Sequence, residues 1–153
     1  TGPYAAEGKD GKALHAVAFA PEQANAPGVK WVRCPPPPSR DKPWDINLNA
    51  TNLRGDNRAA YLRTTVFSPK KQDVQLQVGS DDGVKVWLNG KLVHNNNASR
   101  PDIAGEDKVK VSLDEGWNTL MLKVCNGGGD WGASARFRTE QNEKIEGLKV
   151  KAE

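Results

Sequence analysis

Hydrophobic and polar residues alternate along most of the chain after residue 58. The alternation has a period of two, which is typical of a β-strand with one buried face. It recurs in five segments, whose hydrophobic positions are Val74, Leu76 and Val78; Val84, Val86 and Leu88; Val109, Val111 and Leu113; Leu120, Leu122 and Val124; and Ala133, Ala135 and Phe137. No stretch of ten or more residues has the spacing of a capped helix. The pattern predicts an all-β domain, a two-sheet antiparallel β-sandwich with jelly-roll topology.

A tight hairpin is expected at Asn89-Gly90. Both residue types tolerate the positive φ angles that a type I′ turn requires. Residues 84–88 precede this turn and residues 91–94 follow it. We therefore expect these two segments to pair as neighbouring antiparallel strands.

The first third of the chain lacks this regularity. Residues 1–57 are interrupted by prolines, four of them consecutive at 35–38. Because proline has no backbone N–H, this run cannot lie inside a sheet. Only residues 13–19 and 29–33 have the composition of strands. We expect a single domain over residues 1–153, in which residues 1–57 form an irregular Pro-rich cover and edge strands.

The composition excludes some classes of function. The 153 residues include 22 Lys and Arg against 19 Asp and Glu, and the net charge of +3 is too small and scattered to predict nucleic-acid binding. The mean hydropathy of -0.70 argues against membrane insertion. The first residues resemble no secretory signal, so any export signal would have been removed or left out. Cys34 and Cys125 fit either one disulfide in an exported protein or two free thiols.

Catalytic motifs are absent from the sequence. It contains no nucleophile elbow, phosphate-binding loop or zinc-protease motif. The two histidines, His15 and His94, cannot supply a zinc site without other ligands. A carboxylate pair such as Asp81 with Asp130 could in principle hydrolyse a glycoside, but the adjacent Asp81 and Asp82 on a turn lack the buried cleft that raises the pKa of the acid in glycoside hydrolases. We therefore expect a protein that is not an enzyme.

Residues 61–137 resemble the galactose-binding-like jelly-roll domains. The resemblance is carried by GSDDGVKVWLNGKLV at 79–93 and by EGWNTL at 115–120. The Asn-Gly-Lys hairpin and the Gly-x-Asn-x-Leu entry to the next strand are similar to those of the sugar-binding domain of family 2 glycoside hydrolases. Residues 2–4 and 19–22 are similar to the opening of accessory modules in secreted planctomycete-type proteins. The resemblance implies a carbohydrate-binding fold in an exported protein.

The Ser-Asp-Asp-Gly sequence at 80–83 is also similar to the PA14 domain. In PA14 adhesins paired aspartates and a later asparagine hold calcium, which in turn holds sugar hydroxyls. The resemblance implies a calcium site formed by Asp81, Asp82 and Asn126, and hard oxygen ligands of this kind suit calcium. The alternative is that the aspartates only turn the chain, by accepting hydrogen bonds from nearby backbone amides. Both interpretations remain open at this point.

A sugar-binding rim is expected beside this turn. Trp131 lies among glycines, which favours an exposed ring that stacks on a sugar, with Asp130 next to it. Asn95, Asn97 and Arg100 lie in a polar loop that follows the hairpin. Their amide and guanidinium groups suit vicinal hydroxyls. A loop of this composition is also typical of a solvated turn.

These features predict a non-catalytic carbohydrate-binding module or an accessory domain of an exported, carbohydrate-active protein. The expected localisation is extracellular or periplasmic. Its expected partners are a polysaccharide or glycan and neighbouring domains of a larger protein. The alternative is a structural spacer or interaction domain that binds no sugar.

The other tryptophans are interpreted as scaffold: Trp31 and Trp44 fasten the irregular segment, Trp117 belongs to the family scaffold, and Trp87 lies beneath a covering loop.

Overall fold

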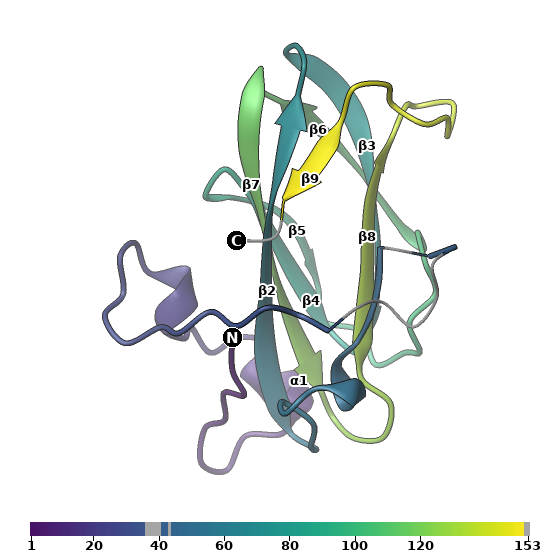
Figure 1. The fold of residues 1–153 in the computed structure, drawn as a ribbon. Coiled ribbons are helices and arrows are strands. Elements are labelled where there is room, and N and C mark those ends of the chain that lie inside the picture. Colours follow the sequence, from purple (N-terminus) through teal and green to yellow (C-terminus); the bar gives the residue numbers. More distant parts are fainter. Residues whose placement is uncertain (36–40, 43, 152–153) are drawn as a thin grey trace.

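A computed structural model describes residues 1–35, 41–42 and 44–151. In this part of the chain two antiparallel sheets face each other (Figure 1). The four-stranded sheet has the order β1-β8-β3-β6, and the five-stranded sheet has the order β5-β4-β7-β2-β9. The all-β, two-sheet antiparallel β-sandwich expected from the alternation is therefore confirmed.

Nine strands and three short helical segments make up the described fold. In chain order they are α1 (Gly11–Leu14), η1 (Ala20–Glu22), β1 (Asp45–Asn47), η2 (Leu48–Ala50), β2 (Arg58–Ser68), β3 (Gln72–Asp81), β4 (Val84–Leu88), β5 (Lys91–Asn96), β6 (Asp107–Leu113), β7 (Gly116–Asn126), β8 (Gly132–Arg138) and β9 (Lys149–Lys151). The chain passes from the four-stranded to the five-stranded sheet at Asp82-Gly83, between β3 and β4.

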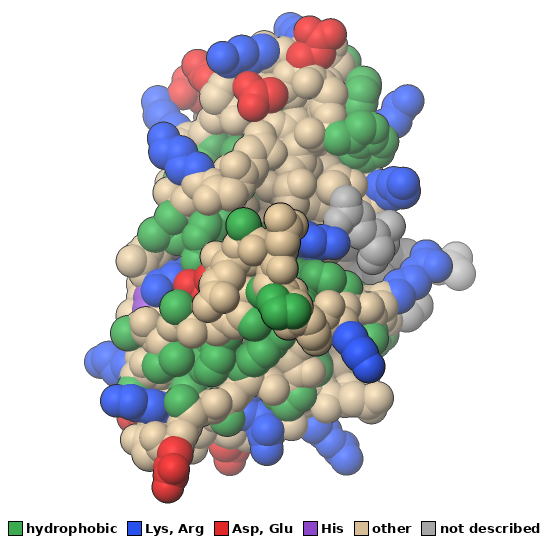
Figure 2. All heavy atoms as spheres, turned by 90° about the vertical axis from the view of Figure 1, so that its left-hand side faces the viewer, with side chains coloured by type: hydrophobic (Ala, Val, Ile, Leu, Met, Phe, Trp, Pro, Cys, Tyr) green, Lys and Arg blue, Asp and Glu red, His purple; other side chains and the backbone are tan. Residues whose placement is uncertain are grey.

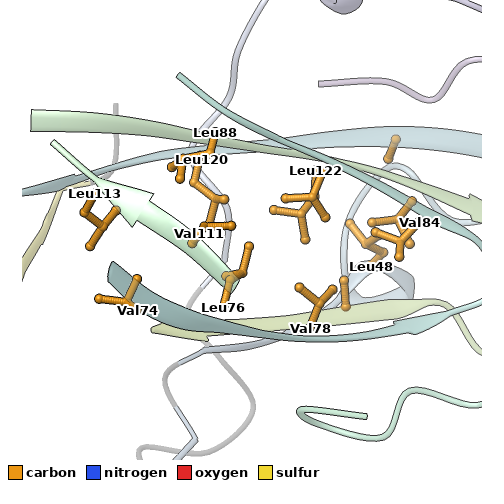
Figure 3. Packing of buried hydrophobic residues seen from close by; sticks show 14 of the residues in the cluster. Leu48, Val74, Leu76, Val78, Val84, Leu88, Val111, Leu113, Leu120 and Leu122 are labelled. Carbon is orange, nitrogen blue, oxygen red and sulfur yellow. The ribbon is translucent and has the colours of Figure 1, made fainter. Parts of the chain in front are cut away.

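The main hydrophobic core lies between the two sheets. The alternating positions of the sequence supply it, because every second residue of each strand points inward. In Figure 3, Val74, Leu76 and Val78 of β3 lie across the core from Leu120 and Leu122 of β7. Four of these side chains are at most 4% exposed and Leu122 is 5% exposed.

The hairpin at Asn89-Gly90 is confirmed. Both residues have positive φ angles, 51° at Asn89 and 78° at Gly90. Strands β4 and β5 pair across the turn, with Leu88 opposite Lys91. The turn therefore has the geometry that the residue types predict.

The first third of the chain covers one sheet edge and one sheet face. The strand expected at residues 13–19 is wrong, because α1 begins at Gly11, where the side chain of Asp10 accepts a hydrogen bond from the N–H of Ala13 at 2.7 Å. Residues 29–33 form no strand either. The expected edge strand is present as β1, which pairs with β8. Residues 36–38 of the proline run lie outside the described residues.

A second, smaller core lies on the outer face of the five-stranded sheet. Leu14, Ala59 and Cys125 form it, and Tyr4 and Phe19 pack against it. The N-terminal segment therefore packs on the outer face of the sheet, at the beginning of β2 and the end of β7, on the left-hand side of Figure 1.

The two cysteines do not form a disulfide. Cys34 is exposed and Cys125 is buried, and both are free thiols. Burial raises the pKa of the Cys125 thiol to about 11. Of the two alternatives left open by the sequence, the structure has two free thiols.

Among the described residues, no helix is long and apolar enough to span a membrane.

Candidate functional site

The Asp82 side chain connects two loops at one end of the sandwich. Its Oδ1 atom accepts hydrogen bonds from the hydroxyl of Ser99 at 3.2 Å and from the backbone N–H of Arg100 at 3.1 Å. Its Oδ2 atom accepts a hydrogen bond from the backbone N–H of Gly127 at 2.8 Å. The carboxylate thus fastens the connection between β3 and β4, where the chain crosses between the sheets, to the loop that contains Ser99 and Arg100 and to the loop that contains Gly127. These contacts favour the turn-forming alternative for Asp82.

The Asp81 carboxyl group lies in an unfavourable electrostatic environment. Burial is the largest cause, and the carboxylates of Asp82, Asp130 and Asp102 add to it, so that the pKa of Asp81 is raised to about 6. The ionised form of Asp81 is therefore less stable in the folded protein than in water.

Replacing Asp81 by asparagine should stabilise the domain at neutral pH. The folded-state pKa lies above the unfolded value of about 3.9, so the cost of ionisation is complete above about pH 6 and absent below about pH 4. We expect Asp81→Asn to raise the free energy of unfolding at neutral pH by about 1 kcal/mol, allowing for solvent screening. Urea unfolding at neutral pH and at about pH 3.5 measures this, with Asp73→Asn on the exposed surface as control. A loss of stability at neutral pH would contradict the argument.

Asn126, the third residue of the expected calcium site, is fully buried. Its Nδ2 atom donates a hydrogen bond to the carbonyl of Gly55 at 2.9 Å, and within the described part of the chain its Oδ1 atom has no partner. In residues 1–35, 41–42 and 44–151, no group of three or more His, Cys, Asp or Glu side chains could hold a metal ion. Calcium binding stays a prediction that titration calorimetry tests.

Trp131 is a core residue, and the expectation that it is exposed is wrong. The side chain is only 2% exposed and packs in the main core, and its carbonyl accepts a hydrogen bond from the N–H of Leu48 at 2.8 Å. A ring buried in this way offers no face to a sugar. The sequence contains a signal for this burial, because Trp131 continues the inward alternation of Ala133, Ala135 and Phe137. The preceding glycines suggested exposure but form only the turn before it.

The guanidinium group of Arg100 is occupied by a network with the start of β6. It donates to both oxygens of Asp107, at 3.0 and 2.5 Å, and to the hydroxyl of Ser80 at 3.1 Å. The carboxylate of Glu106 lies 3.1 Å away, and the Arg100 side chain is 13% exposed. Arg100 therefore ties its loop to β3 and β6 and leaves little of its planar fork for a ligand.

Asp107 is the centre of this network. The ring Nε2 atom of His94 on β5 lies 2.8 Å from its Oδ2 atom, and Asn96 donates to both oxygens at 3.3 Å. The hydrogen bond from Arg100 is the largest cause that holds the pKa of Asp107 well below its usual range, and those from His94 and Asn96 add to it. The network joins edge strand β5 of one sheet to edge strand β6 of the other.

The remaining residues of the expected rim do not converge. Asp130 and Asn95 are exposed, but they come from the β7–β8 loop and from strand β5. Asn97 donates a hydrogen bond to the carbonyl of Lys12 at 3.1 Å and so fastens the N-terminal segment. The structure brings Asp81, Asp82 and the backbone of Arg100 together at one end of the sandwich, without an exposed aromatic ring beside them in the described residues.

An exposed aromatic surface lies elsewhere, on the outer face of the five-stranded sheet. Trp117 is 55% exposed, pairs with Phe67 in register, and meets its ring edge to face with centroids 5.5 Å apart. The ammonium group of Lys149 lies 5.5 Å from the Phe67 ring. Four residues further along β7, Met121 pairs with Trp87 and points to the same side. We call these five residues the aromatic face.

The aromatic face lies on the side of the molecule that Figure 2 shows. Hydrophobic side chains form several separate patches on this side, and basic and acidic side chains lie between these patches as well as around the outline. The sequence interpretation of Trp117 as scaffold missed its exposure. The alternation could have revealed it, because Trp117 is out of phase with the inward positions Leu120 and Leu122.

A cluster of buried ionisable groups lies beneath the N-terminal segment. The Lys123 side chain is fully buried, and its Nζ atom donates to the carbonyls of His15, at 3.2 Å, and Val17 and lies 3.2 Å from the Glu22 carboxylate. Tyr61 donates its hydroxyl hydrogen to the same carboxylate. Burial is the main cause that lowers the pKa of Lys123. Each of these polar contacts helps to anchor the cover to β7 and β2.

Comparisons with known proteins add information on the fold. No protein-family model and no curated protein matches the sequence. Among solved structures, an anti-sigma factor domain-containing protein is similar with a TM-score of 0.57 at 15% identity, over 76% of this chain and 39% of that chain. Another, from Clostridium clariflavum, has a TM-score of 0.49 at 13% identity, over 65% of this chain and 35% of that chain. This chain thus corresponds to well under half the length of these neighbours, and the likeness concerns the fold alone.

Proposed function

We propose that this chain is a non-catalytic interaction domain of a larger protein, and that it docks a neighbouring domain on the aromatic face. The observation that carries the proposal is the exposure of Trp117 beside Phe67. Tryptophan, phenylalanine and methionine are enriched at the centres of protein interfaces, and an exposed cluster of them marks a docking surface.

The position of the aromatic face supports a protein partner. The N-terminal cover occupies one half of the outer face of the five-stranded sheet and leaves the half with Trp117 and Phe67 uncovered. Lys149 stands at its margin on β9. A partner surface with an apolar centre and an acidic border would complement this arrangement. A solved neighbour of similar fold has a longer chain, of which the match covers 39%, so this fold can occur as one part of a larger protein.

Oxidative footprinting read by mass spectrometry tests the proposal. Trp117 should be labelled in the chain of 153 residues and protected in the longer protein that contains its neighbouring domain. Val32, which is 69% exposed on the N-terminal segment, serves as the control for general accessibility. Trp117→Ser should restore labelling of Phe67 in the longer protein, because the docked surfaces separate. Equal labelling of Trp117 in both proteins would refute the docking.

A carbohydrate-binding accessory module of an exported protein is the second candidate. It is favoured by the resemblance of residues 79–93 and 115–120 to sugar-binding jelly rolls, and by the exposure of Asp130 and Asn95. Affinity-gel retardation on plant and algal polysaccharides separates the two functions. Retention that is lost in Asp130→Ala supports this candidate, whereas free migration on every polysaccharide supports the interaction domain. Export stays a prediction.

A further inference from the structure

The five-stranded sheet carries charges of one sign. Its five strands contain no Asp or Glu, although the chain has 19 of these residues. In the four-stranded sheet, by contrast, every strand except β8 contains an aspartate. The basic residues of the five-stranded sheet are Arg58, Arg63, Lys85, Lys91, Lys123, Lys149 and Lys151. The strands of this sheet therefore contribute only positive charge to its outer face.

Three of these lysines point outward beside the aromatic residues. The ammonium group of Lys149 lies 5.5 Å from the Phe67 ring, which places it on the outer face. Lys151 lies two residues further along β9 and points to the same side. Lys85 also points outward, because the residues before and after it on β4 belong to the main core. We call Lys85, Lys149 and Lys151 the basic margin.

The basic margin has no neutralising partner in the described part of the chain. None of its three lysines belongs to an ion pair there. Two other outward cations of the sheet are engaged, since Lys123 contacts the Glu22 carboxylate and Arg63 lies 4.5 Å from the Trp31 ring. The acidic residues just before β7 belong to the turn at the end of the sheet. The charge of the basic margin is thus left for a partner.

The basic margin lies on two sides of the aromatic residues. In the strand order β9-β2-β7-β4, Lys149 and Lys151 come from the first strand and Lys85 from the last. Neighbouring strands are about 4.8 Å apart, so the two sides are separated by about 14 Å. Along β7, Trp117 and Met121 are four residues apart, which is about 13 Å. A partner that covers this surface therefore meets apolar groups in the middle and a lysine on either side.

We infer that the partner of the aromatic face presents an acidic protein surface, with apolar side chains against Trp117 and Met121 and carboxylates at the basic margin. The inference rests on the proposed function, because it names the chemistry of the domain that docks there. Carboxylates would gain attraction to these lysines without breaking an existing ion pair. Leu92, which is 45% exposed and pairs with Trp87, adds an aliphatic group, and aliphatic groups favour apolar side chains over the stacked bases of a nucleic acid.

Footprinting of Trp117 in the longer protein at two salt concentrations tests the role of charge. The labelling rate of Trp117 follows the fraction of molecules in which the docked surfaces are apart. Raising sodium chloride from about 50 mM to about 500 mM should raise this rate several-fold, because salt screens exposed charges. The labelling rate of Val32 on the N-terminal segment should stay the same and is the control.

Charge reversal assigns the effect to the basic margin. Lys149→Glu combined with Lys151→Glu should raise the labelling rate of Trp117 in the longer protein about tenfold, whereas Lys149→Arg with Lys151→Arg should keep the protection. Lys108→Glu with Lys110→Glu makes the same change of charge on the outer face of the four-stranded sheet and should leave the rate unchanged. Thermal unfolding of each variant shows whether it folds.

The outcomes separate this inference from the docking itself. Protection of Trp117 that neither salt nor charge reversal changes would overturn the acidic partner and leave the docking in place. Equal labelling of Trp117 in the chain and in the longer protein would overturn both. Retention of the chain on single-stranded DNA at about 150 mM salt, lost on reversal of Lys149 and Lys151, would assign the basic margin to a nucleic acid and would also overturn the inference.

Discussion

Lys123→Ala should lower the free energy of unfolding by about 3–5 kcal/mol, as the removal of one partner from a buried ion pair does. The ammonium group is fully buried and provides the N-terminal cover with hydrogen bonds to His15 and Val17 and a contact with the Glu22 carboxylate. Without it, the Glu22 carboxylate keeps the hydrogen bond from the Tyr61 hydroxyl but loses its cation. Guanidinium unfolding followed by tryptophan fluorescence measures the loss.

A neighbouring lysine provides a matched control for this prediction. Lys85 lies directly opposite Lys123 in the β4–β7 register, but its side chain is partly exposed. Lys85→Ala should change stability by less than about 0.5 kcal/mol. If both alanine variants lost the same small amount, the buried contacts of Lys123 would not anchor the cover.

A double variant separates charge from packing in the same cluster. Lys123→Met keeps most of the volume but leaves the Glu22 carboxylate without its cation. Adding Glu22→Gln to Lys123→Met should recover much of the lost stability, because no charge then remains buried without a partner. Limited proteolysis should show the N-terminal segment released in Lys123→Ala and retained in the double variant.

The position of Lys123 shows what local sequence patterns can and cannot predict. In β7 the alternation assigns Leu122 and Val124 to the core and Lys123 to the outer face, and this is correct. The pattern cannot show that the outer face is itself covered at this point. Glu22 and Val17, which bury Lys123, lie more than 100 residues earlier in the chain. The period of a strand thus predicts the side on which a residue points but not the exposure of that side.

Trp131 and Asp82 illustrate a second limit. The glycines before Trp131 and the paired aspartates at 81–82 are features of turns, and turns bring both ligand-binding and structural residues to the end of a sandwich. Trp131 points into the core because it is in phase with the inward-facing residues of β8. That alternation extends over more residues than the run of glycines before Trp131, so it is the more reliable signal. The partners of Asp82 come from loops 17 and 45 residues away, and no local pattern records such contacts.

The second large effect is expected from Asp107→Asn, which should lower stability at neutral pH by about 2–3 kcal/mol. The change removes the negative charge that faces the guanidinium of Arg100, a side chain that is only 13% exposed. Charge-assisted hydrogen bonds of this kind contribute more than neutral ones, and a buried cation left with fewer partners is costly. Asp73→Asn, at an exposed position of β3, should change stability by less than about 0.5 kcal/mol.

The pH dependence of unfolding identifies the charge of Asp107 as the cause. Arg100 and His94 hold the pKa of this carboxyl below its unfolded value of about 3.9, so its contribution is complete above about pH 5 and decreases as the pH falls toward the folded-state pKa. The difference in stability between the natural protein and Asp107→Asn should therefore shrink steadily below about pH 4. A difference that stays constant down to about pH 2.5 would mean that the amide of Asp107→Asn destabilises the protein for steric reasons. The negative charge of Asp107 would then not be what holds β5 and β6 together.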